Sequence, residues 1–215
     1  MGNYVGKSVT SHYNHGQTTE LSAMNPLILA SSSPYRKQLL QRLGLTFSCI
    51  SPDIDETPLP QERATELVAR LARQKALAIS PNHHEHLIIA SDQVAALNEH
   101  ILGKPGNHAN ATQQLQQCSG QAVTFYTALH VLNSQTGRSQ HCVETFTVYF
   151  RLLSQQQIQR YLHKEQPYHC AGSFKMEGLG ICLFEKMQGD DPNSLIGLPL
   201  IQLINMLAKE DIPIP

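Results

Sequence analysis

Apolar runs and periodic apolar positions along this chain predict alternating strands and helices. Short apolar stretches at 27–30 and 87–91 are typical of buried strands. A serine-rich turn follows the first of them, and the next segment opens on Pro34, a residue favoured in the first turn of a helix. Leucines at helical spacing predict a second helix over 61–79.

The second half of the chain carries the signals of an antiparallel strand pair. Residues 122–133 and 141–152 are rich in Val, Thr, Phe and Tyr and are joined by a turn. Ser154 then caps a helix that runs through His163, with Gln157 at the third helical position as in a capping box. Further elements are expected as a strand at 46–51, a hairpin of 94–97 with 101–102, a helix at 109–117, a strand near 179–186 and a helix at 199–208.

Together these elements indicate an α/β fold with a mixed twisted sheet and flanking helices, bent into two lobes around a central cleft. One domain is expected over residues 25–215, because no linker or internal repeat divides the chain. Residues 1–24 are polar and lack the apolar core of a signal peptide. We expect them to form a disordered N-terminal extension, and Met24 is a candidate start of the organised chain.

The composition narrows the range of partners. The 215 residues carry a net charge of −1, whereas surfaces that coat nucleic acid need a clear basic excess. No stretch approaches the roughly 20 apolar residues of a membrane span. The five cysteines include no CxxC pair, which suggests reduced thiols. We therefore expect a cytoplasmic protein that binds a small ligand and neither a nucleic acid polymer nor a membrane.

The serine-rich turn is a candidate phosphate site. A helix start presents unpaired N–H groups and the positive end of the helix dipole, and Ser31, Ser32 and Ser33 lie at such a start. Arg36 and Lys37 disfavour the helix by standing in its first turn, so they indicate a bound phosphate. A serine before a proline is also consistent with a plain helix cap.

Other polar side chains of the loops complete a set suited to phosphate chemistry. Cations neutralise a polyphosphate, and carboxylates hold a divalent metal that polarises phosphorus. Asp92 is expected to end a buried strand, where it would offer a rigidly held oxygen ligand. Solvated surface positions are the alternative for Lys75 and Lys104, and a solvated acidic turn is the alternative for Glu56. The full set is Ser31–Ser33, Arg36, Glu56, Lys75, Asp92, Lys104, Lys175 and Glu177.

Seven segments, taken in order, are more specific than any single motif. They are 27–36, 55–58, 70–76, 91–93, 102–105, 171–178 and 193–199. These segments resemble the Maf family of nucleoside triphosphate pyrophosphatases, over residue 26 to the end. The resemblance implies a two-lobed Maf/ITPase-like α/β fold, often dimeric. It also implies hydrolysis of a nucleoside triphosphate to a monophosphate and pyrophosphate with a divalent metal, Mg²⁺ or Mn²⁺.

The resemblance also assigns roles to matching positions. The family's proton acceptor falls on Asp92, and its phosphate-binding arginine falls on Arg36. Its lysines fall on Lys75 and Lys104. The acidic segment places a metal or water ligand at Glu56, and Asp92 is the second candidate metal ligand.

Three positions distinguish the branches of this family. The chain has Tyr35, Gln93 and Glu177. This resembles the branch acting on 7-methyl-GTP, where an aromatic residue, a glutamine and a glutamate hold these places, although a member of that branch carries tryptophan at the first of them. Methylation at N7 makes guanine cationic, and a cationic ring stacks well on an aromatic face. A carboxylate can accept two hydrogen bonds from guanine N1–H and its 2-amino group. The three residues are therefore expected to select the base.

Other functions remain open at this point. The same fold could hydrolyse other non-canonical nucleotides or pyrimidine nucleotides. A nucleotide-binding regulator of cell division or septum formation, without important turnover, is a different class of function. An RNA-cap-binding module is a weaker alternative, because simple binding has no use for the acids and lysines.

Overall fold

The computed structural model describes residues 25–98 and 100–215, so the expectation for residues 1–24 lies outside the described residues. Within them the chain forms one seven-stranded mixed sheet in the order β2-β1-β3-β5-β6-β7, with β4 paired to β3. The strands are β1 (Leu27–Leu29), β2 (Phe47–Cys49), β3 (Leu87–Leu97), β4 (His100–Leu102), β5 (Ala122–Asn133), β6 (Ser139–Phe150) and β7 (Phe184–Gln188). The α-helices are α1 (Pro34–Gln41), α2 (Ala64–Ile79), α3 (His108–Cys118), α4 (Gln155–Glu165), α5 (Pro192–Ile196) and α6 (Leu200–Ala208). The predicted mixed α/β sheet is confirmed.

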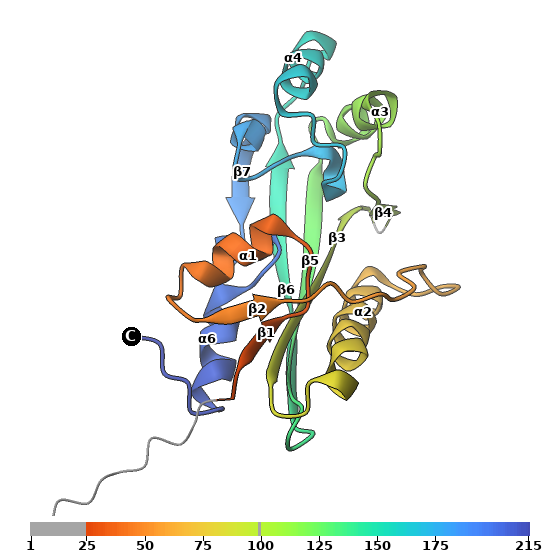
Figure 1. The fold of residues 1–215 in the computed structure, drawn as a ribbon. Coiled ribbons are helices and arrows are strands. Elements are labelled where there is room, and N and C mark those ends of the chain that lie inside the picture. The colour runs from red at the N-terminus through yellow and green to blue at the C-terminus, as the bar shows by residue number, and fades with distance from the viewer. Residues whose placement is uncertain (1–24, 99) are drawn as a thin grey trace, which may run out of the picture.

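The sheet changes from parallel to antiparallel at β3. Strands β2, β1 and β3 run parallel, whereas β3, β5, β6 and β7 pair antiparallel. With 12 residues each, β5 and β6 extend over about 40 Å at ~3.3 Å per residue. Figure 1 shows these two strands running through both halves of the molecule. They join a lower lobe, built from β1, β2, α1, α2 and α6, to an upper lobe that carries α3, α4 and β7.

Helices cover both faces of the sheet in the lower lobe. Side chains of a strand alternate between the two faces, so residues of one parity share a layer. Leu29 and Ile89 pack with the leucines of α1 and α6 in one cluster. Ile28 and Ile88 pack on the opposite face with Ala76 of α2. This double covering explains why the first strands read as continuous apolar runs.

The upper lobe has its own aromatic core. Phe150 at the end of β6 meets Phe174 and Phe184 edge-to-face, with ring centroids 6.3 and 4.9 Å away. Phe125 of β5 approaches Phe174 in the same way, at 5.3 Å. Leu162 of α4 is buried in this cluster. The predicted capping box of α4 is confirmed, because Ser154 Oγ accepts the Gln157 N–H and the Gln157 side chain accepts the Ser154 N–H.

Two segments differ from the sequence-based expectation. The strand expected at 87–91 continues as a single strand to Leu97, because β5 pairs with it from Leu87 to Ala96. The strand expected near 179–186 begins only at Phe184, and Leu179–Leu183 form a 3₁₀ helix instead. Gly180 explains this turn, since its backbone lies against the Lys175 carbonyl and donates to it at 3.0 Å.

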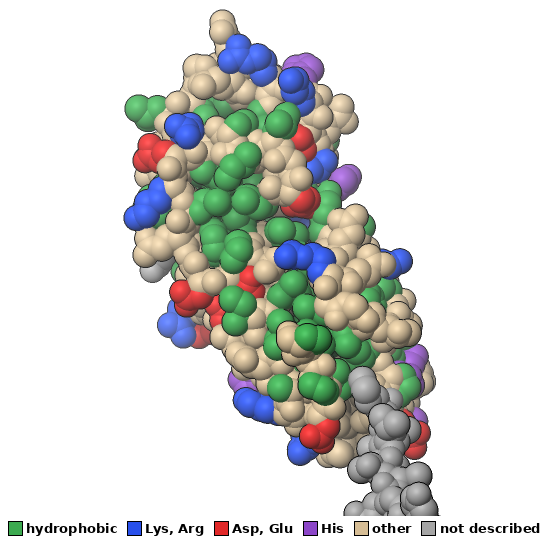
Figure 2. Space-filling view, turned by 90° about the vertical axis from the view of Figure 1, so that its left-hand side faces the viewer, with side chains coloured by type: hydrophobic (Ala, Val, Ile, Leu, Met, Phe, Trp, Pro, Cys, Tyr) green, Lys and Arg blue, Asp and Glu red, His purple; other side chains and the backbone are tan. Residues whose placement is uncertain are grey.

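The surface of the described residues carries some apolar side chains. Figure 2 shows hydrophobic side chains gathered on the upper lobe of one face. Leu152 is 85% exposed, and Leu179 and Ile181 are exposed as well. Among the described residues no helix is long and apolar enough to cross a membrane. The homodimer that the family resemblance implies stays a prediction.

The aromatic core makes a stability prediction. Phe150→Ala should lower the free energy of unfolding by about 3–5 kcal/mol, because it leaves a cavity between two phenylalanine rings. Leu152→Ala is the matched control and should change it by less than ~0.5 kcal/mol, since that side chain is solvated. Urea denaturation of both variants measures the difference. Equal effects of the two substitutions would contradict the packing described for the upper lobe.

Candidate active site

A break in the strand pairing along β3 creates the cleft. One edge of β3 pairs with β5 from Leu87 to Ala96. On the other edge β1 pairs with residues 87–89, and β4 pairs with residues 95–97. Among the described strands none pairs with this edge over residues 90–94. A cleft of about 650 Å³ opens there, lined by residues of both lobes.

Alternation along β3 divides its side chains between two layers. Asp92 shares the parity of Ile88 and therefore faces α2, whereas Ser91 and Gln93 face the layer of α5 and the following turn. Asp92 pairs across to Ala128 in the middle of the strand. The expectation that Asp92 ends a strand is therefore wrong: the neighbouring strand β1 ends, while β3 itself continues. The carboxylate is nevertheless held rigidly by its sheet position.

Lys75 of α2 joins two carboxylates in the cleft. Its Nζ lies 2.6 Å from Asp92 Oδ1 and 2.7 Å from Glu56 Oε1. Lys75 and Asp92 are buried, with 7% and 6% of their surface exposed, whereas Glu56 reaches solvent. The solvated alternative for Lys75 is thus excluded. The loop of Glu56 and the strand of Asp92 are brought together by one ammonium group.

The pKa values of the two carboxylates are shifted in opposite directions from their ordinary values. Burial raises the pKa of Asp92 above its ordinary value, although the charges of Lys75 and Arg36 act against this rise. Burial also acts to raise the pKa of Glu56, but the hydrogen bond from Lys75 and the charges of Lys75, Lys104 and Arg36 outweigh it and leave that pKa lowered. Burial therefore dominates at Asp92, whereas the neighbouring cations dominate at Glu56.

Arg36 is fixed by a backbone carbonyl from the far end of the chain. Its Nε donates to Gly197 O at 2.8 Å, and Ser91 Oγ donates to the same oxygen at 2.8 Å. Gly197 has φ +120°, and a Cβ there would lie 3.2 Å from Arg36 Nε, so glycine suits both the backbone and the close approach. Burial lowers the pKa of Arg36, while Asp92 and Glu56 raise it. A guanidinium remains charged in proteins, so it offers its remaining N–H groups as a cation.

The serine-rich turn forms the start of α1. Ser33 is the N-cap, and its Oγ accepts the Arg36 N–H at 3.4 Å. Ser31 is buried, and its Oγ accepts the Ser33 N–H at 3.1 Å. All three serines line the cleft. Ser33 therefore caps α1 and lines the cleft at the same time.

Tyr35 and Glu177 line the cleft from different lobes. Tyr35 belongs to α1, and Glu177 belongs to the loop that follows the 3₁₀ turn Ala171–Ser173. Burial raises the pKa of Tyr35, and the nearby Cys170, Glu177 and Glu165 raise it further in that order. The apolar side chains of Phe174 and other residues complete this part of the lining. The cleft thus has a charged floor at Lys75 and an aromatic and acidic upper part.

Gln93 has its amide nitrogen engaged by the protein. Its Nε2 donates to Ser194 O at 2.7 Å, to Thr127 Oγ1 at 2.9 Å and to Leu195 O at 3.2 Å. Thr127 Oγ1 donates to the same Ser194 carbonyl at 2.9 Å, so it fixes this arrangement. Gln93 can therefore offer a ligand its side-chain oxygen, which is an acceptor.

Comparison with known proteins identifies the family of the chain. A family model described as Maf-like protein matches residues 26–210. The chain belongs to the Maf-like family. A protein of Pseudomonas fluorescens (strain Pf0-1) named 7-methyl-GTP pyrophosphatase is 58% identical over 192 residues, covering 89% of this chain and all of the relative. Proteins of the same name from Nitrosococcus oceani and Vibrio vulnificus are 56% and 55% identical, covering 87% and 86% of this chain and 94% of each relative.

A solved structure gives a much weaker likeness. The Staphylococcus aureus Ham1 protein is 12% identical, with a TM-score of 0.49, over 86% of this chain and 99% of that one. This is too remote to say anything about the Maf-like chain.

The predicted site residues of this Maf-like protein lie in one cleft, with the exceptions of Lys37 and Lys175. Lys37 is exposed on α1, and the Lys175 ammonium group donates to the Glu165 carbonyl oxygen at 2.6 Å instead. The cleft is lined by Ser31, Ser32, Ser33, Tyr35, Arg36, Glu56, Lys75, Asp92, Gln93, Lys104 and Glu177. Sequence reasoning missed Ser91, Thr127 and Gly197 as supporting residues, although two of them stand in the segments that carried the family resemblance. Gly197 acts through its backbone carbonyl, and because every residue has one, the sequence gives no signal for this role.

Removing the Lys75 ammonium group should change the pKa values of both carboxylates that it contacts. Lys75→Met should raise the pKa of Asp92 further and raise that of Glu56, because both lose a positive charge. A buried carboxylate without a partner should lower the free energy of unfolding by about 3–5 kcal/mol at pH 7. This loss should shrink as the pH falls through the raised pKa of Asp92, since protonation removes the unpaired charge.

Carboxyl-carbon NMR titration and denaturation at several pH values measure these two effects. Lys37→Met on the exposed side of α1 is the control and should leave both carboxyl pKa values unchanged. An unaltered Asp92 titration in Lys75→Met would contradict the described ion pair.

Proposed function

We propose that this Maf-like protein hydrolyses 7-methyl-GTP to 7-methyl-GMP and pyrophosphate. Relatives that are 55–58% identical over most of the chain carry the name 7-methyl-GTP pyrophosphatase. The observation that carries the chemistry is the cation-bridged pair Asp92–Lys75–Glu56 beside Arg36 in a cleft of nucleotide size. Such a site combines positive charge for a triphosphate with carboxylates for a metal and a water.

In the proposed reaction water attacks the α phosphorus. The bond between that phosphorus and the oxygen bridging to the β phosphorus breaks, and pyrophosphate leaves. Asp92 accepts the proton of the attacking water, and its raised pKa supports this role because a stronger base takes up a proton more readily. Arg36, Lys75 and Lys104 neutralise the phosphate oxygens, together with the N–H groups at the start of α1 near Ser31–Ser33.

The donor set fits a divalent cation that arrives with the nucleotide. Asp92 and Glu56 already share one cation, the Lys75 ammonium, at 2.6 and 2.7 Å, and carboxylate oxygens are the ligands that Mg²⁺ and Mn²⁺ prefer. Within residues 25–98 and 100–215 no group of three His, Cys, Asp or Glu side chains is placed to hold a metal ion. We therefore propose that Glu56 and Asp92 hold the metal together with phosphate oxygens. When bound, the metal would neutralise phosphate charge and lower the pKa of the attacking water.

The upper part of the cleft suits a cationic purine. Tyr35 offers an aromatic face, and Glu177 offers a carboxylate that matches guanine N1–H and its 2-amino group. Gln93 adds an acceptor oxygen, because its nitrogen is engaged by the protein. Pyrimidine nucleotides fit this set less well, since uracil has no matching pair of adjacent donors. A cytoplasmic setting is part of the proposal, supported by five free cysteines.

The mechanism predicts a specific loss of turnover. Asp92→Asn should lower kcat by about 100- to 10,000-fold, as expected for loss of a general base. In the wild type kcat/KM should rise with pH through a pKa above the ordinary value of aspartate, because the base must be deprotonated. EDTA should abolish activity, and Mg²⁺ or Mn²⁺ should restore it.

Pyrophosphate release from purified protein measures all three effects. Tight binding of 7-methyl-GTP without hydrolysis in the wild type would instead favour the nucleotide-binding regulator. Full activity of Asp92→Asn would contradict the assigned base.

Base selection is tested by a single charge change. Glu177→Gln should lower kcat/KM for 7-methyl-GTP by about tenfold, since a charged partner of a cationic base is worth roughly 1.4 kcal/mol or more. GTP should lose less, because its base is neutral. Glu185→Gln, an exposed acid of β7, is the control and should change neither value. A wild type that prefers dTTP or UTP to 7-methyl-GTP would contradict the proposed substrate.

A further inference from the structure

The loop that carries Glu177 is fastened to the last turns of α4. Lys175 Nζ donates to the Glu165 carbonyl oxygen at 2.6 Å. The Leu179 N–H donates to Glu165 Oε1 at 3.0 Å. Glu165 therefore holds the loop on both sides of Glu177, with its backbone on one side and its carboxylate on the other.

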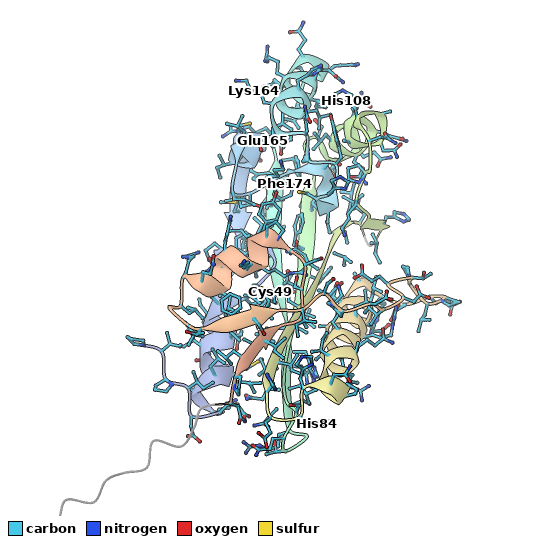
Figure 3. All side chains as sticks on the ribbon, viewed as in Figure 1. Cys49, His84, His108, Lys164, Glu165 and Phe174 are labelled. Carbon is cyan, nitrogen blue, oxygen red and sulfur yellow. The ribbon has the colours of Figure 1, made fainter. Side chains whose placement is uncertain are left out.

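A second residue of α4 supports the same attachment. The Lys175 N–H donates to the Tyr161 hydroxyl at 3.0 Å. Tyr161 and Glu165 stand four residues apart, so they share one face of the helix. Figure 3 shows Glu165 between α4 and the level of Phe174, whereas Lys164 lies at the side of the helix. The loop is thus tied to one helix face by three hydrogen bonds.

Gly178 makes room for the carboxylate. A Cβ at this position would lie 2.5 Å from Glu165 Oε2, which is closer than real Cβ contacts come. A side chain at this position would therefore displace the Glu165 carboxylate from its place beside the Leu179 N–H. The glycine next to Glu177 thus has a packing reason, which the Gly-rich composition of the loop did not reveal.

Glu177 itself has no side-chain hydrogen bond or ion pair to any described residue, and it is exposed. Its position depends on the backbone of the loop, and that backbone depends on α4. A misplacement of about 1 Å at a recognition group can cost a large part of its effect. The fastening is therefore the means by which a solvated acid keeps a defined place in the cleft.

We propose that Glu165 is a positioning residue for base selection, acting through Glu177. This inference rests on the proposed function, because it concerns selection of the cationic base. Glu165 touches neither substrate nor reacting atoms; it fixes the loop. Gly178 supports the same role, because it leaves room for the Glu165 carboxylate.

The test compares four variants for turnover of 7-methyl-GTP and GTP. Glu165→Ala should lower the preference for 7-methyl-GTP, measured as the ratio of kcat/KM values, by about tenfold, mainly through KM. Glu165→Gln should keep most of the preference, because its amide oxygen still accepts the Leu179 N–H. Lys164→Ala changes the neighbouring exposed residue of the same helix end and should leave the preference unchanged. Gly178→Ala should reproduce Glu165→Ala.

A double-mutant cycle separates positioning from general stability. In a Glu177→Gln background, Glu165→Ala should lower the preference no further, since its effect passes through Glu177. Additive losses in the double mutant would overturn the proposal. So would an equal fall of kcat/KM for both nucleotides in Glu165→Ala, which indicates a merely structural role.

Hydrogen exchange of residues 175–180 without nucleotide gives a readout that is independent of substrate. Exchange should be faster in Glu165→Ala than in the wild type and in Lys164→Ala. Unchanged exchange would overturn the fastening itself. A wild type that shows no preference for 7-methyl-GTP would contradict the proposed function, and this would appear before any variant is compared.

Discussion

The site depends on how the two edges of β3 are paired. β3 keeps β5 as a continuous neighbour on one edge, but it divides the other edge between two short strands, β1 and β4. A strand edge without a partner strand leaves its backbone N–H and C=O groups unpaired. Here the interruption is only residues 90–94, and it lies between two lobes with separate cores. The sheet therefore supplies rigidity and an opening at the same place.

Alternation along that strand then distributes the chemistry. Asp92 faces α2 and meets Lys75, while Ser91 and Gln93 face the C-terminal segment and bind its carbonyls. A charged group buried on one face and a network of neutral hydrogen bonds on the other thus come from consecutive residues. Because the backbone of β3 is fixed by β5, both layers are placed by the same hydrogen-bond ladder. Burial gives the acid its raised pKa, and the shared ammonium group keeps the cost of that burial moderate.

Much of this arrangement could be predicted from the sequence, and the failures have physical causes. Apolar runs identified β1 and the start of β3, because residues covered on both faces are continuously apolar. The same signal could not show that β3 runs past Asp92, since polar residues of the cleft interrupt it. Lys75 looked like a solvated lysine, because its burial depends on Glu56 and Asp92, which arrive from distant parts of the chain. The role of Gly197 lies in its carbonyl oxygen, which every residue possesses.

The Gly197 carbonyl has a mechanical consequence. It accepts hydrogen bonds from the arginine of α1 and from the serine beside Asp92, so one atom ties the first helix, the central strand and the C-terminal segment together. The cation expected to bind the phosphates and the carboxylate expected to act on water are therefore held by one connected set of segments. These contacts set the spacing of the two groups through α1, β3 and the C-terminal segment alone, without any residue of the upper lobe.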